Sequence, residues 1–156
     1  MTIELWNFLK VLHEFSGMTA VGALLAALVI TIRATRATDG SPAASHGGLL
    51  RAVSRWLVGP ALGLLLASGL GLALTNSYRF SPTFVALGLG ALLGAIVAWA
   101  VLMIPAEARL ATGAVWGGAA RRWLSGWTLV MVLLLFGAAI MIIRPVWWSG
   151  VSAAAA

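Results

Sequence analysis

The residues best suited to chemistry stand near the start of the chain, where Lys10, His13 and Glu14 precede a long apolar run. A neutral imidazole can ligate the iron of a haem or the magnesium of a chlorin pigment, and a carboxylate can relay protons. Charged and titratable groups are costly inside a bilayer, so each one found there is a candidate functional residue. His13 is therefore the first candidate, as a metal ligand and axial cofactor ligand.

Helical spacing places Lys10, His13, Glu14 and Gly17 on one face of the first predicted helix, because residues three and four apart are neighbours on a helix surface. Two interpretations are open. In the first, Lys10 and Glu14 form an i, i+4 ion pair at a membrane interface and His13 bonds to a loop or a lipid headgroup. In the second, His13 binds haem b or a chlorin pigment, and Gly17 leaves space for a flat ring.

Two residues near the end of the chain could complete such a cofactor site. Met141 could supply a thioether at the depth of His13, and Arg144 could bind a haem propionate or a lipid phosphate through its planar guanidinium. The second histidine, His46, is expected on the opposite side of the membrane. It therefore cannot share an iron with His13.

Other catalytic patterns are missing from the sequence. There is no Ser-His-Asp order, no HExxH motif and no paired carboxylate motif, so we do not expect an enzyme. Glu107 and Arg109 are predicted to form a solvated pair. A proton pathway has little support, because the later predicted helices hold no buried acid or histidine that could continue it.

The composition identifies the class of protein. The chain is 62% hydrophobic and 9% charged, with a mean hydropathy of +1.02, which is typical of an integral membrane protein rather than a soluble domain. A chain of 156 residues has room for one membrane domain, residues 1–156. The absence of cysteine excludes disulfides and thiolate metal sites. The net charge of +6 comes from arginines beside apolar runs, so we do not expect nucleic acid as a partner.

Four apolar segments span about 5–32, 56–75, 82–105 and 123–143, with Pro105 expected to end or kink the third. Roughly 20 apolar residues in a helix cross the hydrocarbon core of a bilayer. The links between them are short or polar, so successive helices should run in opposite directions. The predicted fold is all-α, an antiparallel four-helix transmembrane bundle.

Charge predicts the orientation of this bundle. Most of the ten basic residues lie in the two longer links, and Lys and Arg concentrate on the cytoplasmic side of membrane proteins. Both termini are therefore expected outside. The basic residues of the longer links are Arg33, Arg36, Arg51, Arg55, Arg109, Arg121 and Arg122, and those of the other side are Lys10, Arg79 and Arg144.

Small residues recur at intervals of four in the second and third segments. In lipid, such stripes let two helix backbones approach closely and gain van der Waals contact. The glycines lie inside continuous apolar runs rather than between a strand and a helix, which excludes a phosphate-binding loop. The predicted helix-packing residues are Gly59, Gly63, Ala67, Gly71, Gly90 and Gly94.

These motifs resemble a family of small, uncharacterised four-helix inner-membrane proteins of bacteria. The resemblance rests on Lys10, Leu12, His13 and Gly22, on the apolar stretch 59–72, and on Arg144 with Pro145. The pattern of the first helix is also similar to copper-resistance D-type proteins and to HemJ-type protoporphyrinogen oxidases. The resemblance implies a bacterial inner-membrane location, and for His13 it implies a role in haem binding.

The sequence leads to two functional hypotheses. In the first, the chain is a non-catalytic accessory or structural subunit whose small-residue faces pack against partner helices, or against copies of itself, in a larger respiratory or photosynthetic membrane complex. In the second, it is a small b-type haem or pigment-binding membrane protein, with His13 as axial ligand, that acts in electron transfer or haem handling.

Overall fold

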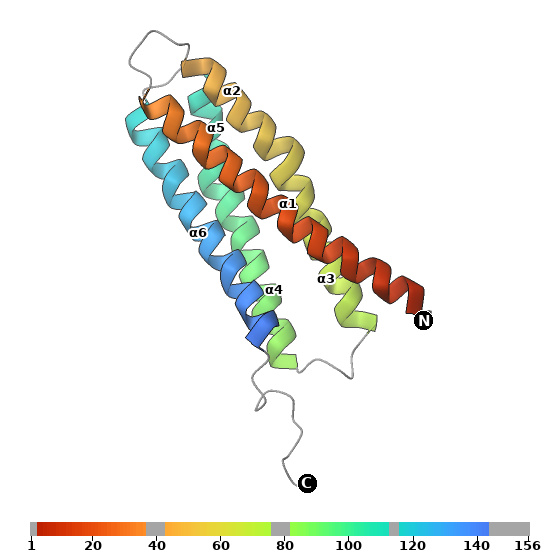
Figure 1. Cartoon of the computed structure of the whole chain (residues 1–156). Coiled ribbons are helices and arrows are strands. Elements are labelled where there is room, and N and C mark those ends of the chain that lie inside the picture. Colours follow the sequence, from red (N-terminus) through yellow and green to blue (C-terminus); the bar gives the residue numbers. More distant parts are fainter. Residues whose placement is uncertain (1–2, 37–42, 76–81, 113–115, 144–156) are drawn as a thin grey trace.

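The computed structural model describes residues 3–36, 43–75, 82–112 and 116–143, and all of them except Thr112 are helical. The predicted all-α four-helix bundle is confirmed (Figure 1). Helix α1 spans Ile3–Arg36 and helix α6 spans Trp116–Ile143. Each of the other two rods is interrupted by a π-helical turn. One comprises α2 (Ala43–Val53), η1 (Ser54–Val58) and α3 (Gly59–Thr75), and the other comprises α4 (Pro82–Ala98), η2 (Trp99–Met103) and α5 (Ile104–Ala111).

All four rods are long and apolar enough to cross a membrane. Large apolar side chains such as Phe15, Met18 and Val97 are exposed on the outer faces of the rods, where a bilayer would cover them. The buried polar residues lie inside the bundle instead. They are Ser16, Thr31, Ser54, Ser68 and Glu107. Together, these properties identify a multi-pass membrane protein.

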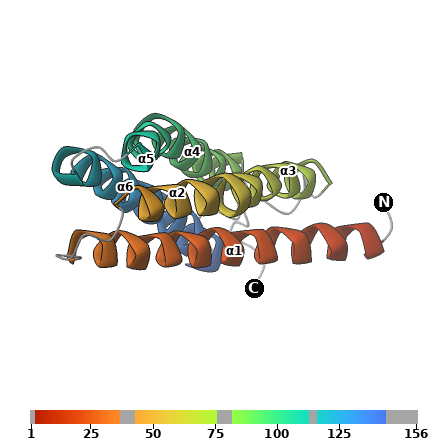
Figure 2. The ribbon, with the colours of Figure 1, turned by 90° about the horizontal axis from the view of Figure 1, so that it is seen from above.

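The rods form two close antiparallel pairs, α1 with α3 and α4 with α6 (Figure 1). A further contact joins α2 to α5 at the end of the bundle where α1 finishes and α6 begins. We call this the arginine-rich end, and the other end, which holds the start of α1, the N-terminal end. Figure 2 shows α1 running past one side of the other rods. The exposed arginines of the arginine-rich end are Arg33, Arg36, Arg51, Arg55, Arg109, Arg121 and Arg122.

The helices at the arginine-rich end are longer than the predicted spans. The second rod begins at Ala43 rather than near 56, the third continues to Ala111, and the fourth begins at Trp116 rather than near 123. The reason is tertiary packing, since Leu50 and Leu110 are fully buried in the core of the bundle. Segments with a polar sequence therefore remain helical because one of their faces packs against another rod.

The two π-helical turns each end two residues before a proline, Pro60 in one rod and Pro105 in the other. A proline ring clashes with the carbonyl four residues before it, and a π turn relieves this strain by widening the helix. In both turns the residue before the proline donates its backbone N–H to a carbonyl five positions earlier, from Gly59 to Ser54 and from Ile104 to Trp99.

Pro105 was predicted to end or kink its helix, and the helix does not end there. Pro105 has no N–H, so a carbonyl in the preceding turn loses its usual donor. The guanidinium of Arg122 in α6 donates to the Val101 carbonyl, four residues before Pro105, at 3.0 Å. A side chain of a neighbouring helix thus replaces the missing backbone donor.

The predicted packing residues fall into two groups. Gly59, Gly71 and Gly94 lie against side chains of other helices, with Trp99, Leu9 and Leu133 respectively at 3.0–3.2 Å from the position of an added Cβ. The other three point outward: Ala67 is exposed, and a Cβ added at Gly63 or Gly90 would meet nothing within 4 Å. Half of the predicted set therefore packs the bundle, and the other half faces its surroundings.

Candidate functional site

His13 joins α1 to α3 near the N-terminal end. Its Nδ1 lies 3.1 Å from the Leu65 carbonyl oxygen and 3.1 Å from Ser68 Oγ. The ring edge also packs on Gly69, where an added Cβ would lie only 3.0 Å from the ring carbon Cε1. The first interpretation expected His13 to bond to a loop or a lipid headgroup. The side chain instead bonds to a neighbouring helix.

These contacts determine the tautomer of the neutral His13 ring. A carbonyl oxygen can only accept, so Nδ1 must carry the proton that reaches Leu65. The Ser68 hydroxyl donates to the Leu64 carbonyl at 2.6 Å and so offers Nδ1 a lone pair. With the proton on Nδ1, Nε2 is the ring nitrogen with a free lone pair.

The predicted ion pair on the first helix is confirmed. Lys10 Nζ lies 3.8 Å from Glu14 Oε1, with both side chains more than half exposed. Lys10 also lies over the ring of Trp6, at 5.6 Å from its centroid. Lys10 and Glu14 therefore sit on the outer face of α1, whereas His13 and Gly17 face α3.

The structure does not bring the other predicted cofactor residues to His13. Met141 belongs to the α4 and α6 pair, where its Cε would lie 3.8 Å from a Cβ added at Gly88, and its side chain is 41% exposed. His46 belongs to α2, at the arginine-rich end. Arg144 lies outside the described residues. Of this set, His13 alone is placed on the α1 and α3 contact.

A second polar cluster lies inside the arginine-rich end, around Glu107 of α5. The side chain is 2% exposed, and its Oε1 accepts a hydrogen bond at 3.1 Å from Nε1 of Trp123, which is completely buried. The Ser54 hydroxyl is a second hydrogen-bond partner of the carboxylate, and Arg51 interacts with it electrostatically. The predicted solvated pair of Glu107 and Arg109 is therefore wrong.

Ser54 connects this cluster to the two π-helical turns. Trp99 Nε1 donates to Ser54 Oγ at 2.8 Å, so the first residues of η1 and η2 are bonded to each other. The proton of the Ser54 hydroxyl is then available for Glu107. A chain of donors thus runs from Trp99 through Ser54 to the carboxylate, and each polar group on it has a partner.

Sequence reasoning missed this cluster because its members are far apart in the chain. Nothing in the local pattern around Glu107 shows that Ser54 or Trp123 will face it. The available signal was the tryptophan content, because a buried indole N–H usually has an acceptor; Trp6, whose buried Nε1 has none among the described residues, is the exception. Trp127 follows the same rule, donating to the Leu24 carbonyl of α1 at 2.8 Å.

Comparison with protein families, with curated proteins and with solved structures gave no match. The chemistry must therefore be inferred from the geometry. Among the described residues, no group of three or more His, Cys, Asp or Glu side chains could hold a metal ion. The Glu107 cluster is a closed network of hydrogen bonds, whereas the His13 ring retains a nitrogen lone pair.

Proposed function

We propose that this protein is a non-catalytic accessory subunit of a larger membrane complex, with both termini outside and the arginine-rich end in the cytoplasm of a bacterium. The observation that carries the proposal is the outward-facing pair of small residues on α3, Gly63 and Ala67. The positive-inside rule supports the orientation, because the exposed arginines gather at one end.

An exposed glycine in the middle of a membrane helix needs a reason. Glycine lowers helix stability by about 1 kcal/mol relative to alanine, and lipid gains nothing from its small size. A partner helix does gain, because its backbone can approach closely and make van der Waals contact along the stripe. Gly63 and Ala67 are one helical turn apart and so present such a surface. The expected partner is a transmembrane helix of another subunit.

The proposal is tested by purification from the native membrane in a mild detergent. A co-purifying membrane subunit is expected with the natural chain and should be lost when Gly63→Leu covers the stripe. Ala138→Leu enlarges another exposed small residue, on α6, and is the matched control, which should retain the partner. Migration of the natural chain as a lone species, or as a homo-oligomer unaffected by Gly63→Leu, would contradict the proposal.

The geometry of His13 favours haem binding as a second candidate function. Histidines that ligate metals almost always donate their other ring N–H to a carbonyl or a carboxylate, as Nδ1 does here to Leu65. His13 would then bind haem iron through Nε2, and the bound haem would supply electron-transfer chemistry. Met141 does not fit as the opposite ligand, because it lies in the other helix pair.

A visible spectrum of the purified protein tests this second candidate. A Soret band that is abolished in His13→Ala but retained in Met141→Leu is the expected result. A protein without any haem or chlorin absorption after expression with excess haem would refute it. Ser68→Ala is a useful intermediate variant, because it removes one acceptor of Nδ1 while leaving the Leu65 carbonyl in place.

A further inference from the structure

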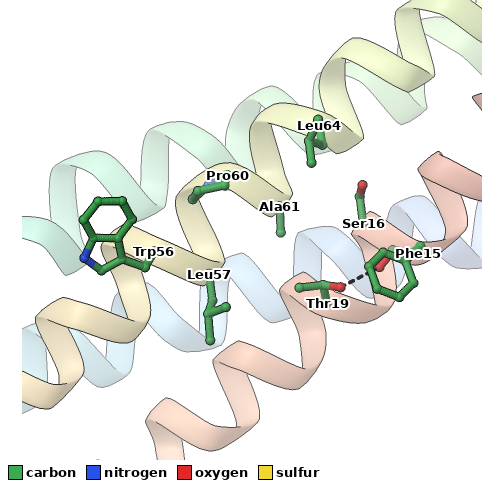
Figure 3. Close-up of a pocket in the computed structure, with 8 residues that line it drawn as sticks. All are labelled: Phe15, Ser16, Thr19, Trp56, Leu57, Pro60, Ala61 and Leu64. Atoms are coloured by element: carbon green, nitrogen blue, oxygen red, sulfur yellow. Dashed lines mark hydrogen bonds between the residues drawn. The ribbon is translucent and has the colours of Figure 1, made fainter.

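A groove lies on the lipid-facing surface between α1 and the rod that contains η1 and α3 (Figure 3). Along this rod it runs from Trp56, at the end nearer the arginines, to Leu64, and α1 contributes Phe15 and Thr19 to its other wall. It is open along one side and has a volume of about 110 Å³. The remaining lining residues are Ser16, Leu57, Pro60 and Ala61.

The groove is apolar even where its side chains carry hydroxyl groups. The Ser16 hydroxyl donates to the Leu12 carbonyl at 2.6 Å, and the Thr19 hydroxyl donates to the Phe15 carbonyl at 2.8 Å. Both protons are therefore committed to the backbone of α1. A hydrocarbon chain could lie in the groove without leaving either hydroxyl proton unpaired.

A cation lies at the arginine-rich end of the groove. The guanidinium of Arg55 lies over the ring of Trp56, with its central carbon 5.8 Å from the ring centroid. Such a cation–π contact restrains an arginine while leaving its N–H donors free to bind an anion. Glu107 is the acidic side chain that the structure describes at this end, and it is buried, so the exposed charge there is positive.

The lining and the neighbouring charge favour a lipid as the occupant of the groove. A single extended hydrocarbon chain matches an apolar channel within the span of the helices, and an anionic headgroup matches the cation beside Trp56.

We propose that this groove binds one acyl chain of an anionic phospholipid, whose headgroup phosphate is held by Arg55. Trp56 holds the guanidinium beside the arginine-rich end of the groove, and Leu57, Pro60 and Leu64 line the path of the chain. Arg55 selects an anionic headgroup over a zwitterionic one, because basic sites between membrane helices attract negatively charged lipids. The inference is independent of both functions proposed above.

Native mass spectrometry of the full chain in detergent, with added palmitoyl-oleoyl phosphatidylglycerol or phosphatidylcholine, tests the proposal. The protein should retain phosphatidylglycerol with an affinity about fivefold higher, the factor expected for one interfacial arginine. Arg55→Gln should abolish this preference. Arg121→Gln removes an exposed arginine of α6 at the same end and should leave the preference unchanged.

Two further measurements distinguish a bound lipid from other occupants of the groove. Thr19→Phe narrows the groove and should reduce retention of both lipids while keeping Arg55 intact. Glycerol phosphate, which has the headgroup chemistry but no chain, should not compete. Equal retention of both lipids by the natural chain, equal effects of the two arginine variants, or competition by glycerol phosphate would overturn the proposal. A change in oligomeric state with Thr19→Phe would instead assign the groove to a second copy of the chain, and would likewise overturn it.

Discussion

Replacement of Glu107 provides the sharpest test of the fold, because this side chain is the shared acceptor of a buried cluster. Glu107→Leu fills a similar volume but removes the acceptor of the Trp123 indole N–H and of the Ser54 hydroxyl. Each buried donor left without a partner costs about 1–3 kcal/mol. The variant should therefore lose roughly 2–6 kcal/mol of unfolding free energy.

Two further substitutions separate hydrogen bonding from other effects. Glu107→Gln retains an oxygen at the position of Oε1, so it should lose less than about 1 kcal/mol. Trp123→Phe removes the donor and leaves the carboxylate to Ser54. If the bond between the two side chains matters, the double variant Glu107→Leu with Trp123→Phe should be less destabilised than the sum of the single variants, by about 0.5–3 kcal/mol.

The measurement is equilibrium unfolding in mixed micelles with increasing sodium dodecyl sulfate, followed by far-ultraviolet circular dichroism so that the loss of a tryptophan does not change the signal. The reasoning fails if Glu107→Leu unfolds within about 0.5 kcal/mol of the natural chain. It also fails if the two single substitutions add without coupling, because the structure places their polar atoms 3.1 Å apart.

Two other predictions use the same unfolding measurement. Gly47→Ala should destabilise the bundle by about 1–3 kcal/mol, because the new Cβ would overlap the backbone of Leu110. At the neighbouring position, the Cβ of Gly48→Ala meets nothing within 4 Å, so this variant should be neutral or stabilising. Similar results for the two variants would contradict the packing of α2 on α5. His13→Phe should cost about 1–2 kcal/mol and Ser68→Ala no more than about 0.6 kcal/mol, because the Leu65 carbonyl still accepts from Nδ1 in the second variant. Equal losses in these two variants would show that the carbonyl is not an acceptor.

The parts of the structure that depend on local sequence could be predicted. Long apolar runs specify membrane-length helices whatever their partners, because the backbone must satisfy its hydrogen bonds within each segment. The ion pair of Lys10 with Glu14 is equally local, since residues four apart meet on any helix. Both were predicted because neither depends on how the rods are arranged.

The parts that depend on contact between rods could not be predicted in the same way. Gly47 permits α2 to approach the backbone of Leu110, and this contact extends the helices beyond the predicted spans. Glu107 has a polar sequence environment that is typical of a loop, yet packing of α5 against α6 buries it beside Trp123. Sequence distance hides such pairs, and a single sequence gives no independent signal for them.

The distribution of polar contacts explains how this bundle acquires a unique arrangement in lipid. Apolar helices gain little by choosing one register over another in a bilayer, because lipid tails are as apolar as leucine. His13 fixes α1 against α3, and the indole of Trp127 fixes α6 against α1. The cluster of Trp99, Ser54, Glu107 and Trp123 fixes both interrupted rods and α6 at the other end.

Because these bonds engage most polar groups inside the bundle, recognition of another molecule is left to exposed groups, to Nε2 of His13 and, within the described part of the chain, to the unpaired indole N–H of Trp6. Nδ1 of His13 and the indole N–H groups of Trp99, Trp123 and Trp127 are all engaged with neighbouring helices. The guanidinium of Arg55 is exposed beside an apolar groove, and Gly63 is exposed on α3. Substitutions inside the bundle should therefore change stability, whereas those at Arg55 and Gly63 should change binding while the fold persists.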